Sequence, residues 1–151
     1  MVCVSVKGNL LASGSKDKTV QVWDMETKTR VAQFQHENEV WCVQFHNNWL
    51  ITCSLDKTVR IWDVEAQKEI HKLPHSTYCK NFDLSPDKTL LAVACDASVV
   101  LWDFKNMTRI KEFKFRKDIC DARFNPAGNK LIVGALIGDV YKIDLAFDSK
   151  N

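Results

Sequence analysis

A short motif returns four times along the chain at an almost constant spacing. It reads SKDKTVQVWD at 15–24, SLDKTVRIWD at 54–63 and CDASVVLWD at 95–103, and a weaker copy reads GALIGDVYKID at 134–144. The last residue but one of each copy is Trp23, Trp62, Trp102 or Ile143, so the spacings are 39, 40 and 41 residues. A repeat of this length predicts several copies of one small structural unit stacked against each other. The motif constrains the architecture strongly, but it does not identify a partner.

The second repeat shows most clearly how one unit is built. Four runs of five or six residues lie at 40–45, 49–53, 58–62 and 69–73, and turn residues separate them; the first, VWCVQF, is rich in β-branched and aromatic residues. Such runs predict antiparallel strands, whereas no segment of helical length has an apolar period of 3.6 residues. We therefore predict an all-β chain of about four four-stranded antiparallel units, the last of them incomplete.

The composition fits one globular domain. Apolar residues make up 46% of the 151 residues, which is enough for a sizeable packed core. The 21 basic and 19 acidic side chains leave a net charge of +2. This balance gives no general electrostatic attraction to nucleic acid or to an anionic membrane, so neither is an expected partner.

The cysteines and the start of the chain indicate an intracellular protein. No run approaches the roughly 18 apolar residues that cross a bilayer, and the first residues lack the charged segment of a signal peptide. The six cysteines form no CxxC motif and no zinc-finger spacing with histidine. We expect reduced thiols that serve as small apolar side chains, no metal, no cofactor, and a cytoplasmic or nuclear location.

Four-stranded units at a period of 40 residues resemble the WD (tryptophan–aspartate) repeat family of β-propellers. The residues that carry the resemblance are the three Trp-Asp pairs at 23–24, 62–63 and 102–103, and the turn residues six positions before each tryptophan, Asp17, Asp56 and Asp96. The resemblance covers 1–151 as a single domain, with repeats at about 1–35, 36–74, 75–114 and 115–148. The first two repeats are most similar to those of F-box/WD proteins, because LLASGSKDKT and LITCSLDKT follow short turns.

By this resemblance, a complete repeat contains a hydrogen-bonded set of His, Ser or Thr, Asp and Trp that stabilises the blade. The second repeat has all four, as His36, Thr52, Asp56 and Trp62. The first repeat has Ser13, Asp17 and Trp23, and the third has His75, Asp96 and Trp102, with Ala92 at the hydroxyl position. Because buried polar groups need partners, we interpret this set as structural rather than catalytic.

The fourth repeat departs from the pattern at every position of the set. Its four residues are Phe115, Val133, Ile137 and Ile143. Replacing all partners of a polar network together leaves no polar group unpaired. The fourth repeat therefore need not be unstable.

Propellers of this family bind partners on the rim around their central opening. The resemblance places eight residues there: Lys16, Glu39, Trp41, Leu55, Tyr78, Lys80, Cys95 and Asp118. Trp41 and Tyr78 are the strongest candidates, because large aromatic side chains dominate binding energies. Packing between neighbouring blades is the alternative role for Trp41.

These features predict a non-catalytic scaffold that binds peptides or proteins within a larger complex. The chain has no GxSxG turn and no glycine-rich phosphate loop, so no enzyme site is predicted. Two alternatives stay open: a substrate-recognition subunit of a ubiquitin ligase, and a ribonucleoprotein or RNA-processing component. The second depends on 111–117, where basic residues flank Phe113 and Phe115; a solvated outer strand is the other interpretation of that stretch.

The number of repeats raises the question of how a ring could close. Four is fewer than the roughly seven blades usual for this family, and an open arc would expose the apolar faces of its first and last blades. Three hypotheses follow. The chain is a piece of a longer protein, or a second copy or another chain completes its ring, or four blades close alone in a distorted form.

Overall fold

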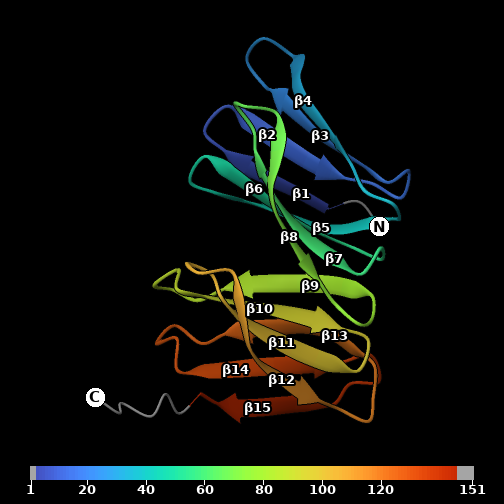
Figure 1. Cartoon of the computed structure of the whole chain (residues 1–151), viewed down its shortest axis with the longest axis vertical. Coiled ribbons are helices and arrows are strands. Elements are labelled where there is room, and N and C mark those ends of the chain that lie inside the picture. The colour runs from blue at the N-terminus through green and yellow to red at the C-terminus, as the bar shows by residue number, and fades with distance from the viewer. Residues whose placement is uncertain (1–2, 146–151) are drawn as a thin grey trace. The chain divides into compact units, whose positions relative to one another are not determined.

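The computed structural model describes residues 3–145 and is built from β-strands (Figure 1). The fifteen strands of this range form four sheets, three with four strands and the last with three. Residues 3–145 contain no helix, and hence none that is long and apolar enough to cross a membrane. The prediction of an all-β chain with an incomplete fourth unit is confirmed. Residues 146–148 of the predicted fourth repeat lie outside the described range.

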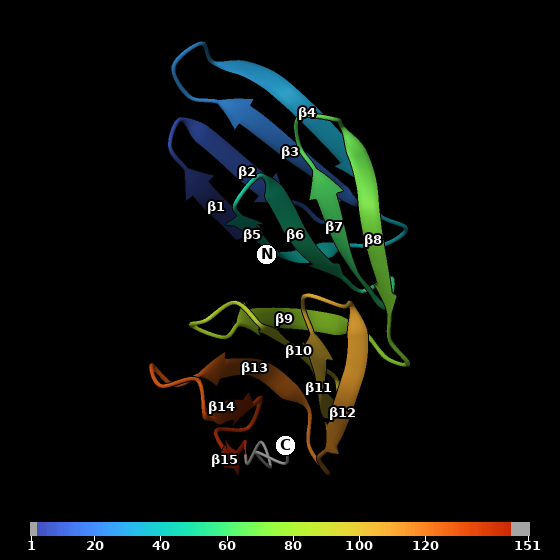
Figure 2. The same ribbon diagram turned by 60° about the vertical axis from the view of Figure 1, so that its left-hand side comes forward.

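In each of the first two sheets, the four strands lie side by side in sequence order. The first contains β1 (Cys3–Lys7), β2 (Leu10–Gly14), β3 (Thr19–Asp24) and β4 (Thr29–Gln35). The second contains β5 (Val40–His46), β6 (Trp49–Ser54), β7 (Thr58–Asp63) and β8 (Lys68–Pro74). Figure 2 shows the twist of these strands from one to the next, as is usual for sheets of L-amino acids.

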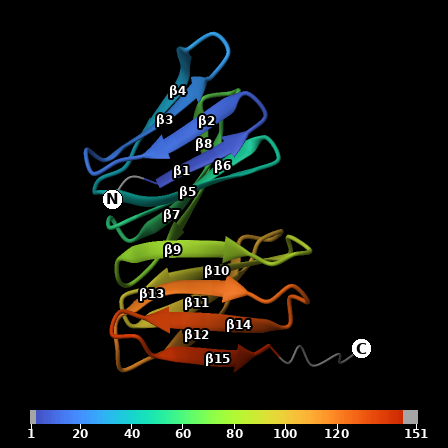
Figure 3. The same ribbon diagram turned by 180° about the vertical axis from the view of Figure 1, so that it is seen from behind.

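The third and fourth sheets repeat the same order. The third contains β9 (Cys79–Leu84), β10 (Leu90–Cys95), β11 (Ser98–Asp103) and β12 (Thr108–Lys114). The fourth contains β13 (Ile119–Phe124), β14 (Lys130–Ala135) and β15 (Val140–Asp144), which lie side by side in that order in Figure 3. Each of the four sheets is therefore one repeat of the sequence.

The chain divides into two compact units, Met1–Lys80 and Asn81–Asn151, with the boundary inside β9. In the first unit, the first two sheets pack face to face through a buried apolar cluster that includes Ala12, Val20, Val43, Leu50 and Trp62. In the second unit, β10 and β11 pack against the fourth sheet through Ala92, Val99, Ala122 and Leu131. The branched residues of the strands thus supply both the strand propensity and the core.

The tight turns that join the second and third strands have a shared backbone geometry. Lys18, Lys57 and Gly138 occupy equivalent positions and have φ values of 74°, 67° and 88°. Lys18 and Gly138 each donate a backbone hydrogen bond to the residue three positions earlier, Ser15 or Ala135. A left-handed residue reverses the chain within few residues, which places the residue before it, Asp17 or Asp56 in the first two repeats, at the end of the blade.

Candidate functional site

The four polar side chains of the second repeat form a continuous hydrogen-bonded chain. His36 Nδ1 lies 2.7 Å from Asp56 Oδ2, and His36 Nε2 lies 2.7 Å from Thr52 Oγ1. The indole N–H of Trp62 donates to the same hydroxyl at 2.9 Å. His36 is 2% exposed and Thr52 is fully buried, so this network joins the linker before β5 to β6 and β7 inside the blade.

Arg60 is a further member of the network that the sequence analysis missed. Its Nη2 donates to Asp56 Oδ2 at 3.2 Å and to Glu37 Oε1 at 3.3 Å, and its Nη1 donates to Glu69 Oε2 at 3.3 Å. The residue is only 8% exposed. The sequence did contain an indication of this role, because Arg60 stands in the middle of the apolar run TVRIW. A charged side chain in a buried strand requires partners.

The Asp56 carboxylate is the centre of this set. Its side chain is 2% exposed, and it also accepts hydrogen bonds from the Thr58 N–H and hydroxyl and from the Glu37 N–H. Burial by itself raises the pKa of Asp56, but the hydrogen bonds from His36 and Thr58 and the charge of His36 outweigh that effect. The pKa therefore lies well below its ordinary value of 3.8, and the group is ionised at neutral pH.

The first repeat holds its aspartate differently. Asp17 is exposed and accepts from the Thr19 N–H at 2.9 Å and the Thr19 hydroxyl at 2.6 Å. Hydrogen bonds from Thr19 lower the pKa of Asp17 below its ordinary value. Ser13 on β2 and Trp23 on β3 are half-buried, in contrast to the buried Thr52 and Trp62.

The structure corrects one position of the third repeat. Trp102 lies opposite Leu91, just as Trp62 lies opposite Leu50, so the residue equivalent to Thr52 is Val93 rather than Ala92. Counting ten residues back from the tryptophan gives Thr52 in the second repeat but Ala92 in the third. The turn after β10 is one residue shorter than the turn after β6, so the equivalent residue lies only nine positions before Trp102. Trp102 is buried and Asp96 is half-buried, and both have interaction partners. His75 lies 3.1 Å, through Nδ1, from the Leu73 carbonyl oxygen.

In the fourth repeat, three of the four substituted positions are apolar contacts. Phe115, Val133 and Ile143 belong to the core of the second unit, and the Phe115 ring lies 5.0 Å from the ring of Tyr141, the counterpart of Arg60. Ile137, at the position of the turn aspartate, is 69% exposed. The polar set is therefore replaced by a core contact that does not include the turn residue.

Of the predicted rim residues of the first two repeats, three lie on neighbouring loops, and Trp41 lies at the irregularity near the start of β5. Lys16 is exposed in the turn after β2, whereas Glu39, Trp41 and Leu55 are half-buried. Backbone hydrogen bonds join the loops, from the Val40 N–H to the Ser15 carbonyl and from the Leu55 N–H to the Glu39 carbonyl, both at 3.0 Å. The Trp41 indole N–H donates to Glu39 Oε2 at 3.3 Å, which holds that side chain at the loop edge.

The remaining predicted rim residues differ in exposure. Tyr78 is 45% exposed, with Lys57 Nζ 5.8 Å from its ring centroid, and Lys80 is half-buried. Asp118 is exposed, and its carbonyl accepts from the Leu136 N–H. Cys95 is a correction to the predicted rim, because it is 1% exposed and its thiol points back to the Val93 carbonyl at 3.9 Å. It is closed to a partner because it ends β10 inside its sheet.

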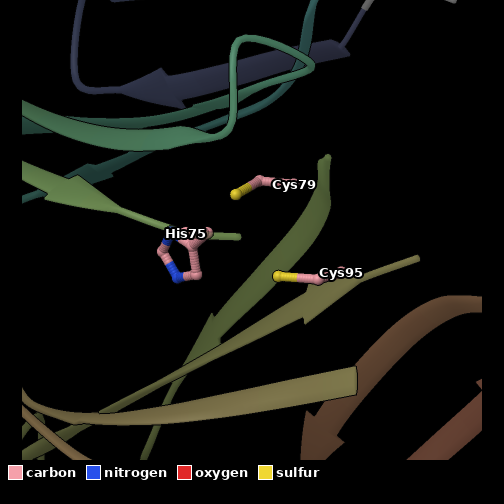
Figure 4. A group of neighbouring side chains, drawn as sticks. All are labelled: His75, Cys79 and Cys95. Atoms are coloured by element: carbon pink, nitrogen blue, oxygen red, sulfur yellow. The ribbon is translucent and has the colours of Figure 1, made fainter. Parts of the chain in front are cut away.

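The six cysteines form no disulfide. Burial raises the pKa of the Cys3 thiol to about 11 and raises that of Cys53 as well, so both stay protonated and unreactive at neutral pH. Figure 4 shows His75 and Cys79, which belong to the first unit, and Cys95, which belongs to the second. These side chains therefore define no metal site within either unit.

The basic stretch 111–117 is engaged in contacts within the second unit. Phe113 and Phe115 pack against the apolar core, and Lys111 Nζ lies 5.1 Å from the Phe113 ring centroid. Lys117 forms an ion pair with Asp139, which raises the pKa of the lysine. The aromatic rings are thus used by the fold, whereas base stacking requires exposed rings.

Each unit has a groove between its two sheets, at the strand ends opposite the loops that contain the predicted rim residues. The groove of the first unit has a volume of about 380 Å³ and is lined by Leu10, Val31 and Phe45, among others. The groove of the second unit, about 620 Å³, is lined by Pro86 and Ile110, among others. Neither groove contains a residue of the predicted rim, so they are separate surfaces.

Comparisons with known proteins agree with this geometry. The family model described as "WD domain, G-beta repeat" matches residues 2–24, 28–63 and 67–103. No curated protein matches the chain. Among solved structures, the chain is similar to the crystal structure of the computationally designed Ika4 protein, with a TM-score of 0.85 and 22% identity over 95% of this chain and 90% of that one. This likeness shows the fold, whereas the matched repeats, which end at the Trp-Asp pairs, show the family. The chain belongs to the WD repeat family of β-propeller proteins.

Proposed function

We propose that the chain is a non-catalytic scaffold that binds a peptide or protein segment at the loops around Trp41. WD propellers in general bind other proteins, and the family is generally non-catalytic. The observation that supports this surface is that backbone hydrogen bonds join the start of β5, which contains Trp41, and the loops that contain Lys16, Glu39 and Leu55. Loops fixed by a rigid sheet are the usual place for a binding site.

The chemistry of these loops indicates the kind of segment that would fit. Trp41 offers a half-buried aromatic surface, and Glu39 adds a carboxylate beside it. Lys16 is exposed on the turn after β2, which the Val40–Ser15 backbone hydrogen bond joins to the start of β5, and Tyr78 adds a second aromatic ring within the same unit. Such a surface suits a segment with an apolar anchor between charged residues of both signs.

A selection experiment tests this proposal. Peptides would be selected from a displayed random library on the wild-type chain, and their affinities measured for wild type, Trp41→Ala and Ile110→Ala. We expect Trp41→Ala to weaken binding by about 1 kcal/mol or more, with little change in melting temperature. Ile110→Ala serves as the matched control, because Ile110 is 48% exposed and lies in the groove of the other unit.

Two results would contradict the assignment of this surface. Peptides that bind Trp41→Ala as tightly as wild type would place the site elsewhere. A large fall in melting temperature without loss of binding would assign Trp41 to packing between blades, where a large aromatic residue contributes several kcal/mol.

A narrower form of this proposal is a substrate-recognition subunit of a ubiquitin ligase. It is supported by the short turns of the first two repeats and by their likeness to F-box/WD repeats. Affinity purification of the whole chain from cytoplasmic and nuclear extracts, followed by mass spectrometry, distinguishes the forms. Co-purified adaptor and cullin subunits would support the ligase, whereas RNA-processing factors would support a ribonucleoprotein role instead. Whether the partners come from the cytoplasmic or the nuclear extract would indicate where the protein acts.

A further inference from the structure

The two sheets of the first unit meet in a defined way. The face of the second sheet that contains Val43, Leu50 and Trp62 packs on the face of the first sheet that contains Ala12 and Val20. The Phe34 ring of β4 stacks on the Trp62 ring, with centroids 4.7 Å apart. We call the face of a sheet that contacts the preceding blade its leading face, as in the second sheet here. The opposite face, which contacts the next blade, is its trailing face, as in the first sheet here.

The second unit repeats this contact position by position. The leading face of the fourth sheet supplies Ala122 and Leu131, and the trailing face of the third supplies Ala92 and Val99. A side chain of the preceding blade also accepts a backbone N–H of the next blade in both units. Ser5 Oγ accepts from Phe45 at 3.1 Å, and Asp83 Oδ2 accepts from Phe124 at 2.9 Å.

The leading face of the first sheet is also apolar, but no other sheet within residues 3–145 packs against it. Val4 and Val6 stand at the positions of Val43 and Phe45, and they are 61% and 57% exposed, whereas Val43 is 4% exposed. The strand register puts Leu11 opposite Val6, and Trp23 opposite Leu11. Residues opposite each other in antiparallel strands share a face, so these four apolar side chains form one surface.

The trailing face of the fourth sheet is also uncovered. Ile132 and Val140 stand at the positions of Ala12 and Val20, which are fully buried in the first unit. Here Ile132 is 41% exposed and Val140 is 70% exposed. Exposed branched residues at these two positions are what a further blade would bury.

Gly134, at the edge of the trailing face of the fourth sheet, is a second indication that this face can receive another blade. Gly14, on the trailing face of the first sheet, leaves no room for a Cβ, because one built there would lie 2.7 Å from Val40 Cγ1 and 2.9 Å from Val43 Cγ1 of the next blade. Gly134 holds the equivalent position in the fourth sheet, and no atom lies within 4 Å of a Cβ built there. The second strand of the fourth repeat thus has the same small residue as the first sheet, beside open space, whereas the third sheet has the buried Ala94 at this position.

We propose that these two faces bind each other between two copies of the chain. Each copy supplies the face that the other lacks, with Val4 of one copy seated against Val140 and Gly134 of the next. Lys142 stands at the position of Val22, which shares its cluster with Trp62. In the contact between copies, its ammonium would therefore meet the Trp23 ring and form a cation–π pair.

The side chain–backbone hydrogen bond of the built-in contact is not reproduced between copies. Arg123 stands where Ser5 and Asp83 accept an amide, and its guanidinium already pairs with Asp121 at 3.0 Å. A guanidinium has no acceptor lone pair. The contact between copies is consequently weaker than that within a unit, and association depends on protein concentration. This head-to-tail contact does not use the loops around Trp41, so it stands or falls independently of the proposed function.

Light scattering coupled to size exclusion tests the proposal over a wide range of concentration. We expect the wild-type chain of 17.3 kDa to reach twice that mass or a higher multiple as concentration rises. Val4→Asp and Val140→Lys each place a charge in an apolar contact and are expected to weaken association by about tenfold or more. Ile110→Asp is the matched control, because Ile110 is 48% exposed on β12 and belongs to neither face.

A mixing experiment identifies the faces directly. An equal mixture of Val4→Asp and Val140→Lys chains contains one unaltered pair of faces, so we expect association to return in the mixture at concentrations where each variant alone is monomeric. Circular dichroism of each variant verifies that it is folded. A wild-type chain that stays monomeric at every concentration, or an oligomer that both substitutions leave intact, would overturn the proposal.

Discussion

The second and fourth repeats fill the same positions of the blade with different side chains, polar in the second and apolar in the fourth. In the second, His36, Thr52, Asp56 and Trp62 form a buried hydrogen-bonded chain with Arg60 as a fifth member. In the fourth, Phe115, Val133 and Ile143 occupy the corresponding places as part of an apolar core. The strands of both sheets nevertheless pair in the same order and in equivalent registers.

The difference teaches that the polar set stabilises a blade without being required for one. Apolar packing holds the strands of the fourth repeat together, and it leaves no polar group to be satisfied. A polar network adds directional constraints, but each member depends on the others because a buried group without its partner is costly. The second repeat should therefore be sensitive to the loss of any one polar partner, whereas the fourth should be sensitive to the introduction of a polar group.

The largest effect is expected for Asp56→Ala. This change leaves His36 and the nearly buried Arg60 without their shared carboxylate, and breaking a buried ion pair from one side costs about 3–5 kcal/mol. The free energy of unfolding, from urea denaturation of the whole chain, measures it. A loss below about 1 kcal/mol would show that the network contributes little beyond apolar packing.

A reciprocal exchange between the two repeats is expected to give a smaller loss in both directions. Thr52→Val removes the acceptor of the Trp62 N–H and a partner of His36, and Val133→Thr buries a hydroxyl in the apolar core of the second unit. Each change is nearly isosteric, so each should cost about 1–3 kcal/mol through an unpaired polar group. If Val133→Thr were neutral in the same urea titration, the apolar character of the fourth repeat would not matter.

The two repeats should also differ in their response to acid. Because the pKa of Asp56 is lower in the folded chain than its ordinary value of 3.8, its contribution is complete above about pH 5 and is lost progressively as the pH falls below that value. We expect Asp56→Asn to reduce the slope of unfolding free energy against pH in this range. The exposed aspartates of the other turns are present in both proteins, so their contributions cancel. An unchanged slope would contradict the assigned role of Asp56.

The smallest effect is expected for Ile137→Ala, the counterpart of Asp56→Ala in the fourth repeat. Ile137 is 69% exposed, and substitutions of exposed residues usually change stability by about 0.5 kcal/mol or less. The same urea titration provides the comparison. A loss that matched Asp56→Ala would mean that the turn position is important whatever residue it holds.

Much of the architecture could be predicted from the sequence because the repeat is regular. Trp62 and Trp102 fixed the third strand of their sheets, and the short runs between turn residues fixed the strands around them. Val93 was missed because a turn one residue shorter moves the hydroxyl position without changing the Trp-Asp ending. Cys95 was expected on the rim because, like Leu55, it comes one residue before the turn aspartate, but the shorter turn makes it the strand-pairing equivalent of Ser54, which is also buried.

The sequence by itself determined that this chain is made of WD blades, because strand propensity, turn residues and the period of 40 residues are local properties. It also supplied the four members of the complete polar set. Only the tertiary structure decided that Arg60 joins that set, that Ile137 stands apart from the core, and that Val4 and Val140 lie on uncovered faces. These are properties of contacts between strands far apart in the chain, and no local pattern records how closely such strands approach.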